Sequence, residues 1–327
     1  MKAAFVPVAG PAETIEVGDL PTPKPQAGQV LVRVRASAVN PIDVYVRSGA
    51  VAMPLPSPFI PGCDLAGEVV EVGEGVTRFT VGDRVWGSNQ GLLGRQGTLA
   101  ELAAVDEAWL YATPDGVDDE TAAAGALVGI TAGLGLFHHA SLQAGETVLV
   151  NGGAGGVGST VIQMAKAQGA RVIATASSEA KRDRCRELGA DEAIDYREAA
   201  AFEPYSSAVD LWWEASRTPD LRRIVATLAE RGRAVLMAGR DAAPELPVGP
   251  FYVKGLSLVG FAMFKDPPEV QRAAAERINT WLASGAYRPP IDRVFNLDQA
   301  ADAHRLQEEN TLSGAGTLSG KIVVAID

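Results

Sequence analysis

The chain has 327 residues, of which 47% are hydrophobic and 21% charged, a composition that argues against a disordered chain. Because a chain of this length rarely folds around a single hydrophobic core, we expect two domains. The net charge of -11, without any run of Lys or Arg, argues against a nucleic-acid-binding protein. Two widely separated cysteines, Cys63 and Cys185, indicate no disulfide framework, and no apolar stretch resembles a signal peptide or a membrane span, so we expect a cytoplasmic protein.

Short strand patterns dominate the first third of the chain. Residues 30–39 alternate in polarity and carry β-branched side chains, and residues 65–73 and 83–88 form further strand patterns between Gly- and Pro-rich turns. Because no long helical pattern intervenes, we expect a β-rich, barrel-like domain.

From residue 118 the pattern changes to alternating helices and strands. Residues 118–140 are rich in Ala, with acidic residues in the first turn, which is typical of a helix. Strand patterns at 146–152, 170–176, 209–215, 233–239 and 257–261 then alternate with helix patterns at 156–169, 178–189 and 219–232. This alternation predicts an α/β domain built on a doubly wound parallel sheet.

The last sixty or so residues combine both kinds of pattern. Residues 267–285 predict a helix with Pro at its start and Gly just past its end. A short helix at 298–307 and an apolar strand at 320–327 follow. Because that strand has no βαβ partner, we expect it to return to the first domain.

The strongest motif is a glycine-rich turn between a predicted strand and a predicted helix. Its first glycine permits a tight turn, its second lets the backbone approach a pyrophosphate, and its third lets helix pack against strand. The free N–H groups and the positive dipole end of the helix favour phosphate binding. The turn therefore predicts a dinucleotide site, which consists of Gly153, Ala154, Gly155, Gly156, Val157 and Gly158.

The end of the second strand bears on the choice of cofactor. NAD-binding proteins place Asp or Glu there, on the ribose hydroxyls. Here the strand ends at Ala176-Ser177-Ser178, and Lys181 and Arg182 follow in the next helix, which suits a 2′-phosphate. A solvated helix face would explain the two cations equally well from spacing alone, so both interpretations stay open.

Several further segments carry a resemblance that extends over nearly the whole chain. They are VNPIDVYVRSG, PGCDLAGEVVEVG, GDRVWGS, LGADEAIDYRE and SGKIVV, together with the glycine-rich turn. The chain resembles quinone oxidoreductases of the zeta-crystallin type, a zinc-independent branch of the medium-chain dehydrogenase/reductase superfamily. The resemblance implies a GroES-like catalytic domain of residues 1–120 and 268–327, with a Rossmann domain of residues 121–267 inserted.

The resemblance also implies that no metal is bound. Zinc-dependent relatives carry Cys at the position of Asn40, a His-Glu pair at Cys63-Asp64, and a four-cysteine lobe that this sequence lacks. Catalytic zinc needs about three Cys, His or carboxylate ligands, and the three histidines of this chain lie elsewhere. Without a Lewis acid an unactivated alcohol is hard to deprotonate, so we expect substrates that accept hydride readily.

The family's site residues can be carried over by position. Asn40, Tyr45 and Thr131 fall where the family lines the nicotinamide and substrate, which makes Asn40 and Tyr45 candidate catalytic residues. Lys181 and Tyr196 fall where it binds the 2′-phosphate, which favours NADPH. With the glycine-rich turn, the expected cofactor-binding residues are Asn40, Tyr45, Thr131, Ser177, Lys181, Tyr196, Gly239, Arg240, Phe261 and Met263.

Each of these residues also has a structural interpretation. Tyr45 can simply pack at the edge of a strand, and Asn40 can cap the turn before Pro41. Asp43 and Arg47 are expected to form a structural ion pair. The two cysteines and the tryptophan pair at 212–213 are expected to be structural as well.

Together these observations predict an NADPH-dependent reductase of a quinone or a conjugated carbonyl. The alternatives are a reductase of 2-alkenals or enoyl thioesters, and a protein that binds NADPH without catalysis. We expect a small-molecule substrate, no nucleic acid and no membrane. A homodimer is expected through the apolar strand at residues 257–261, because an unpaired sheet edge is a liability.

Overall fold

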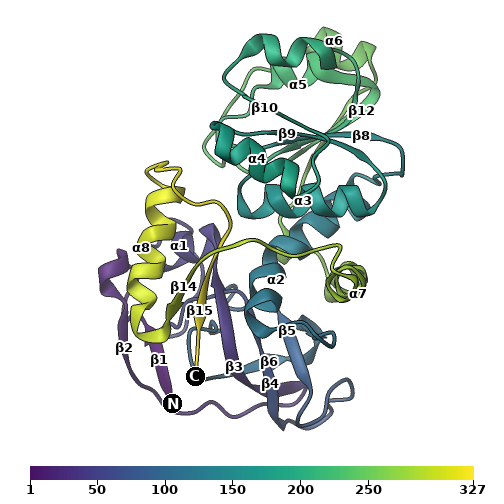
Figure 1. The fold of residues 1–327 in the computed structure, drawn as a ribbon. Helices are drawn as coiled ribbons and strands as arrows, with labels where there is room; N and C mark the ends of the chain where they lie inside the picture. Colours follow the sequence, from purple (N-terminus) through teal and green to yellow (C-terminus); the bar gives the residue numbers. More distant parts are fainter. The chain divides into compact units, whose positions relative to one another are not determined.

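The computed structural model describes residues 1–327 and divides into two compact units. The first consists of Met1–Leu127 and Pro289–Asp327, and the second of Val128–Arg288 (Figure 1). These boundaries differ from the expected ones, because helix α7 (Pro268–Ser284) belongs to the second unit. The reason is packing: a Cβ built on Gly133, the last residue of helix α2 (Asp119–Gly133), would lie 3.2 Å from the Cβ of Ala274 on α7.

The first unit is built on a seven-stranded sheet, which confirms the expected β-rich domain. Its strands are β3 (Gln29–Val39), β4 (Leu65–Val72), β5 (Arg84–Gly87), β6 (Leu102–Asp106), β7 (Leu110–Ala112), β14 (Ile291–Asn296) and β15 (Lys321–Ala325). The order is β14-β15-β3-β4-β5-β7, with β6 on β3. Strand β15 pairs antiparallel with β3, so the last strand returns to the first domain as expected.

Smaller elements complete the first unit. Strands β1 (Lys2–Phe5) and β2 (Glu16–Asp19) form a separate antiparallel pair. Helices α1 (Pro41–Arg47) and α8 (Ala300–Thr311) pack side by side (Figure 1). Arg47 of α1 forms an ion pair with Glu308 of α8, so the expected pairing of Arg47 with Asp43 is wrong. Arg47 points toward the neighbouring helix instead, where its guanidinium also donates to the Gly10 carbonyl oxygen at 2.8 Å.

The second unit contains a six-stranded parallel sheet of order β10-β9-β8-β11-β12-β13, which confirms the doubly wound prediction. The strands are β8 (Thr147–Asn151), β9 (Arg171–Thr175), β10 (Glu192–Ile194), β11 (Val209–Glu214), β12 (Leu228–Leu236) and β13 (Ser257–Gly260). Helices α3 (Gly156–Ala167) and α4 (Glu179–Glu187) cover one face, and α5 (Leu221–Thr227) and α6 (Val248–Val253) the other (Figure 1). The order reverses beside β8, where such sheets bind ligands.

The core of the second unit follows from the alternation of its strands. Trp212 of β11 packs on the α5 and α6 face, with its ring centroid 6.0 Å from that of Phe202. Trp213 points to the opposite face, where it fills the space beside Gly135. Both tryptophans are fully buried, as expected. Truncating either to Ala should cost about 3–5 kcal/mol.

Helix α5 ends earlier than its pattern suggests. The predicted helix ran to residue 232, but α5 stops at Thr227 and β12 begins at Leu228. The Lys254 ammonium donates to the carbonyl oxygens of Val225 and Leu228, at 2.9 and 2.8 Å. This side chain from outside the segment thus caps the helix end, and no local pattern encodes it.

The helical stretch Asp119–His139 begins with α2 (Asp119–Gly133) and ends in a π-helical turn, Leu134–His139. By length and composition alone it could cross a membrane, which the sequence analysis did not foresee. However, 78% of its most apolar window is buried inside the protein. This burial is typical of the core helix of a globular protein.

Candidate functional site

The glycine-rich turn connects β8 to α3 in the second unit. A Cβ on Gly158 would lie 2.1 Å from the Gly152 carbonyl oxygen, and one on Gly153 would lie 2.9 Å from the Cys185 sulfur. Gly155 is exposed, and the nearest atom to its added Cβ would be 3.5 Å away. The outer glycines are therefore needed for packing, while Gly155 leaves the backbone open to an approaching group.

The N-terminus of α3 fits a pyrophosphate. Gly155 is its N-cap in an extended conformation, and no side chain caps the first turn, which is formed by Gly156, Val157 and Gly158. The N–H groups of a first turn have no partner within the helix, and the positive end of the dipole adds to their attraction for an anion. Ala154 precedes this turn and is buried. The residues present thus fit a dinucleotide.

A buried polar network lies beneath the turn, and the sequence analysis missed it. The Thr175 hydroxyl donates to Asn151 Oδ1 at 2.6 Å and accepts from the Gly152 N–H at 3.2 Å. Asn151 Nδ2 donates to Glu214 Oε1 at 2.8 Å. Burial raises the pKa of Glu214, which also accepts from the Ser216 N–H at 2.7 Å. The available signal was three polar residues, each at the last position of an apolar parallel strand.

Cations gather around Ser177, beyond the end of β9. The Ser178 hydroxyl caps α4 by accepting from the Lys181 N–H at 3.3 Å, which places Lys181 in the first turn of that helix. Arg197, which the sequence analysis did not select, donates to the Ser177 carbonyl oxygen. Arg182 pairs with Asp195 at 3.1 Å and with Glu179 at 2.5 Å, and its side chain is 17% exposed.

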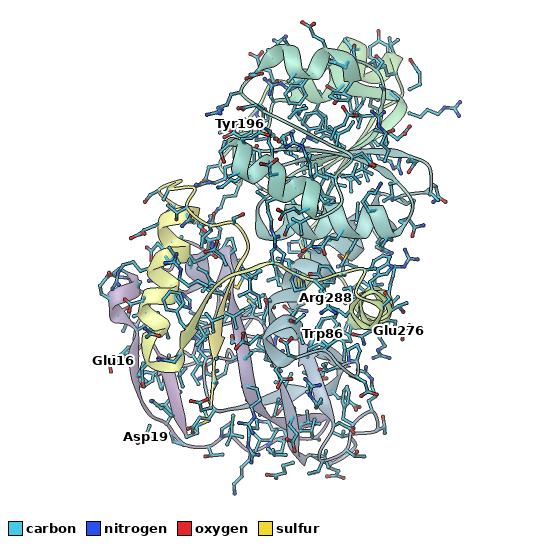
Figure 2. All side chains as sticks on the ribbon, viewed as in Figure 1. Glu16, Asp19, Trp86, Tyr196, Glu276 and Arg288 are labelled. Carbon is cyan, nitrogen blue, oxygen red and sulfur yellow. The ribbon has the colours of Figure 1, made fainter.

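Asp195 organises these cations. Its carboxylate accepts from Arg197 at 2.5 Å and from Arg182 at 3.1 Å. Hydrogen bonds from Arg197, the largest cause, hold the pKa of Asp195 well below its usual range. The next residue, Tyr196, is exposed (Figure 2). Its carbonyl oxygen accepts from Arg223 at 2.9 Å. Lys181 and Tyr196 therefore flank a fixed Arg–Asp–Arg arrangement.

The remaining expected residues of the second unit lie at three places. Thr131 of α2 contacts Met263, with its hydroxyl 3.4 Å from the sulfur, so these two are brought together. Phe261 stacks on the His139 ring with centroids 4.6 Å apart. Gly239 and Arg240 lie in the loop after β12; Gly239 has a φ of 80° and a Cβ there would meet the Arg217 carbonyl oxygen at 2.6 Å, while Arg240 is exposed.

In the first unit, Asn40 is the N-cap residue of α1 and is fully buried. Its N–H donates to Asp43 Oδ2 at 2.8 Å. Its Nδ2 donates to Asp64 Oδ2 at 2.8 Å, and its Oδ1 accepts from the Lys321 ammonium. Tyr45, one turn further along α1, is half-buried. The side chain of Asn40 is thus engaged within the protein at both ends of its amide.

Asp64 is the most enclosed carboxylate of this cluster. It accepts from the Ser88 hydroxyl at 2.7 Å and from the Leu127 N–H at 3.0 Å, besides Asn40. Burial raises its pKa to about 7, against the opposing effects of Lys321 and the hydrogen bond from Asn40.

These residues do not fit a zinc ion. Burial raises the pKa of Cys63, and its thiol donates to Asp43, so Cys63 stands as a neutral thiol at the position where the zinc-dependent relatives carry His. Asn40 offers an amide oxygen that already accepts from an ammonium. The cluster therefore already contains a cation, the Lys321 ammonium, and lacks the set of Cys, His or carboxylate ligands free to bind a metal ion.

Comparison with known proteins places the chain among the nucleotide-dependent dehydrogenases. Residues 26–115 match the family model for the alcohol dehydrogenase GroES-like domain. Residues 156–280 match the model described as zinc-binding dehydrogenase. Fold, turn and matches together define the class: a two-domain oxidoreductase with a GroES-like and a Rossmann domain.

Individual relatives narrow the class. The quinone oxidoreductase of Sus scrofa is 32% identical over 313 residues, covering 94% of this chain and 92% of the relative. An NADPH-dependent alkenal/one oxidoreductase of Arabidopsis thaliana is 34% identical, covering 89% of this chain and 72% of the relative. The Escherichia coli quinone oxidoreductase complexed with NADPH superposes with a TM-score of 0.84 at 25% identity, covering 99% of this chain and 100% of that structure. This chain belongs to the quinone oxidoreductase family of the medium-chain dehydrogenase/reductase superfamily.

Proposed function

We propose that the protein is an NADPH-dependent reductase that transfers hydride to a quinone or a conjugated carbonyl without zinc. The observation that carries this proposal is the surroundings of Ser177. No carboxylate stands at the end of β9 itself to bind ribose hydroxyls. Arg197 donates to the Ser177 carbonyl oxygen, and Lys181 lies in the first turn of the helix that follows. A 2′-phosphate would gain charge-assisted hydrogen bonds in such surroundings.

Each part of the chain has a defined task in this reaction. NADPH, when bound, supplies the hydride, and a quinone that accepts it takes up one proton to become a hydroquinone. The glycine-rich turn binds the pyrophosphate, and Lys181 and Tyr196 bind the 2′-phosphate. Thr131, Gly239, Arg240, Phe261 and Met263 contact the rest of the cofactor.

Asn40 and Tyr45 are proposed at the reacting end of the cofactor. Because the Asn40 amide is held at both ends, its contribution is a fixed position rather than proton transfer. The Tyr45 hydroxyl is the candidate proton donor, with water as the alternative.

The absence of zinc from the reaction is part of the proposal. It rests on the neutral Cys63 thiol and on the Lys321 cation beside Asn40. Elemental analysis of active protein tests it. Stoichiometric zinc together with loss of activity to a chelator would overturn it.

A second candidate substrate class is the 2-alkenals. The name of the Arabidopsis thaliana relative favours it. NADPH oxidation measured against quinones, enals, enones and acyl thioesters separates the classes by kcat/KM. Binding of NADPH that quenches fluorescence, without turnover of any of them, would instead support a protein that binds the cofactor without catalysis.

We also propose a cytoplasmic homodimer assembled through the Rossmann domain. Strand β13 is the edge of its sheet, and Val248, Tyr252 and Val253 on the neighbouring α6 are exposed apolar residues. Pairing this edge across a two-fold axis would cover it. Light scattering that reports a monomer at micromolar concentration contradicts the dimer.

A further inference from the structure

A lysine lies buried at the start of the last strand. Lys321, the first residue of β15, is only 4% exposed. Its ammonium donates to the Val39 carbonyl oxygen at 3.0 Å and to Asn40 Oδ1. Lysine is almost never buried without a compensating partner, because an ammonium loses most of its hydration there. The burial of the Lys321 ammonium therefore has to be explained by the groups around it.

The side-chain amide of Asn40 lies between the Lys321 ammonium and the carboxylate of Asp64, which compensates its charge. Its amide oxygen faces the Lys321 ammonium, and its amide nitrogen faces Asp64 at 2.8 Å. The amide dipole is thus aligned between a cation and an anion. Turning it over would place NH₂ against the ammonium and oxygen against the carboxylate, and both contacts would be repulsive.

Asn40 also connects this arrangement to α1. Its backbone N–H donates to Asp43 at the start of the helix, and Tyr45 follows one turn later. The strand pairing that brings Lys321 here is fixed, because Ile322 of β15 lies opposite Val39 of β3. Lys321, Asn40 and the first turn of α1 are therefore linked by hydrogen bonds within one unit.

We infer that Lys321 is a positioning residue of the proposed reductase: its ammonium is a built-in cation that sets the orientation of the Asn40 side chain and thereby the start of the helix that presents Tyr45. This inference rests on the proposed function, since it assigns Asn40 and Tyr45 to the reacting end of the site. It goes further by giving a protein cation the charge-balancing task among Asp43, Cys63 and Asp64.

The inference is tested by separating charge balance from orientation. Lys321→Met removes the cation and leaves Asp64 and Asp43 uncompensated. The double variant Lys321→Met/Asp64→Asn removes the Asp64 charge as well, which leaves Asp43 alone near the Asn40 amide nitrogen, but it still lacks the donor that orients the amide. Lys24→Met, at an exposed lysine of the same unit, is the matched control.

The expected results differ among these variants. Lys321→Met should lower the melting temperature and reduce kcat by about ten- to a hundredfold, the cost of a small misplacement. The double variant should recover much of the melting temperature but little of the kcat. The dissociation constant for NADPH should change much less than kcat in both, because the residues proposed to bind the pyrophosphate and the 2′-phosphate belong to the second unit. Lys24→Met should resemble the wild type throughout.

Two outcomes overturn the inference. One is a Lys321→Met variant with wild-type kcat. The other is a double variant that regains kcat together with stability, which would make Lys321 a charge-balancing group and nothing more. If Lys321→Met does not accumulate as folded protein, the double variant carries the same comparison. Wild-type protein that binds NADPH but turns over no substrate would instead refute the proposed function.

Discussion

The hydroxyl of Thr175 donates to Asn151 Oδ1 at 2.6 Å and ties together the last residues of β8 and β9 beneath the glycine-rich turn. The same hydroxyl accepts from the Gly152 N–H. The turn is therefore held from below by side chains as well as by its own glycines, and the shape that would receive a pyrophosphate depends on this bond.

Thr175→Val should test that dependence. Valine keeps the shape of threonine but removes the donor to Asn151 and the acceptor for Gly152, and leaving such buried groups unpaired costs about 1–3 kcal/mol. We expect a lower free energy of unfolding and weaker binding of NADPH. Thr280→Val, on an exposed face of α7, is the control and should change neither. Equal effects from both variants would show that the hydroxyl beneath the turn has no special role.

Two glycines of the turn should respond differently to Ala. Gly158→Ala places a Cβ 2.1 Å from the Gly152 carbonyl oxygen, so backbone must move and the protein should lose about 1–3 kcal/mol or more. Gly155→Ala meets nothing closer than 3.5 Å and should leave the melting temperature nearly unchanged while weakening NADPH. Thermal melting and cofactor titration check both. A stable Gly158→Ala variant with normal affinity would contradict the packing argument.

Lys181→Ala should change the preference between the two cofactors. Hydrogen bonds to charged groups contribute roughly 1.5–3 kcal/mol, so NADPH should bind about ten- to a hundredfold more weakly. NADH lacks the phosphate, and its dissociation constant should barely change. Arg184→Ala, on the same helix but paired with Glu187, is the matched control. Wild-type protein that prefers NADH, or a variant whose affinity for both cofactors falls equally, would contradict the assignment of the 2′-phosphate site to Lys181.

Much of the fold could be predicted from the sequence because its signals are local. The alternation of strands and helices predicted the doubly wound sheet, and the unpartnered β15 predicted a return to the first unit. The glycine-rich turn was predictable for the same reason, since its spacing is fixed within six residues.

The features that could not be predicted from the sequence depend on contacts between residues far apart in the chain. Lys321 is a polar first residue of an apolar strand, and only the pairing of β15 with β3 places it beside Asn40. Arg47 pairs with Glu308, far away in sequence, although Asp43 stands four residues before it. Arg197, which follows β10, donates to the carbonyl oxygen of Ser177, which follows β9. No periodicity encodes such partners, so each had to be read from the structure.

Tyr45→Phe should keep NADPH binding and lower turnover. The hydroxyl is proposed to donate a proton or orient the substrate, and a true general acid contributes on the order of 10²-fold or more. The pH dependence of kcat for the variant and the wild type distinguishes the roles. Unchanged turnover at every pH would leave Tyr45 with a packing role alone.

Asp64→Asn should flatten the pH dependence of stability. Burial raises the pKa of Asp64 in the folded protein to about 7 from its ordinary value of 3.8, so between these values the folded state holds a proton that the unfolded state has lost. Stability contributed by this group is therefore complete below the lower value and is lost as the pH rises through about 7. Asparagine does not titrate, so relative to the wild type the variant should gain stability over that interval, by a few kcal/mol.

The groups facing Asp64 that set this balance are Asn40, Asp43, Cys63, Ser88, Leu127 and Lys321. Urea unfolding at a series of pH values measures the difference, with Asp19→Asn at an exposed site as the control. A difference that does not change with pH would mean that Asp64 keeps an ordinary pKa despite its burial.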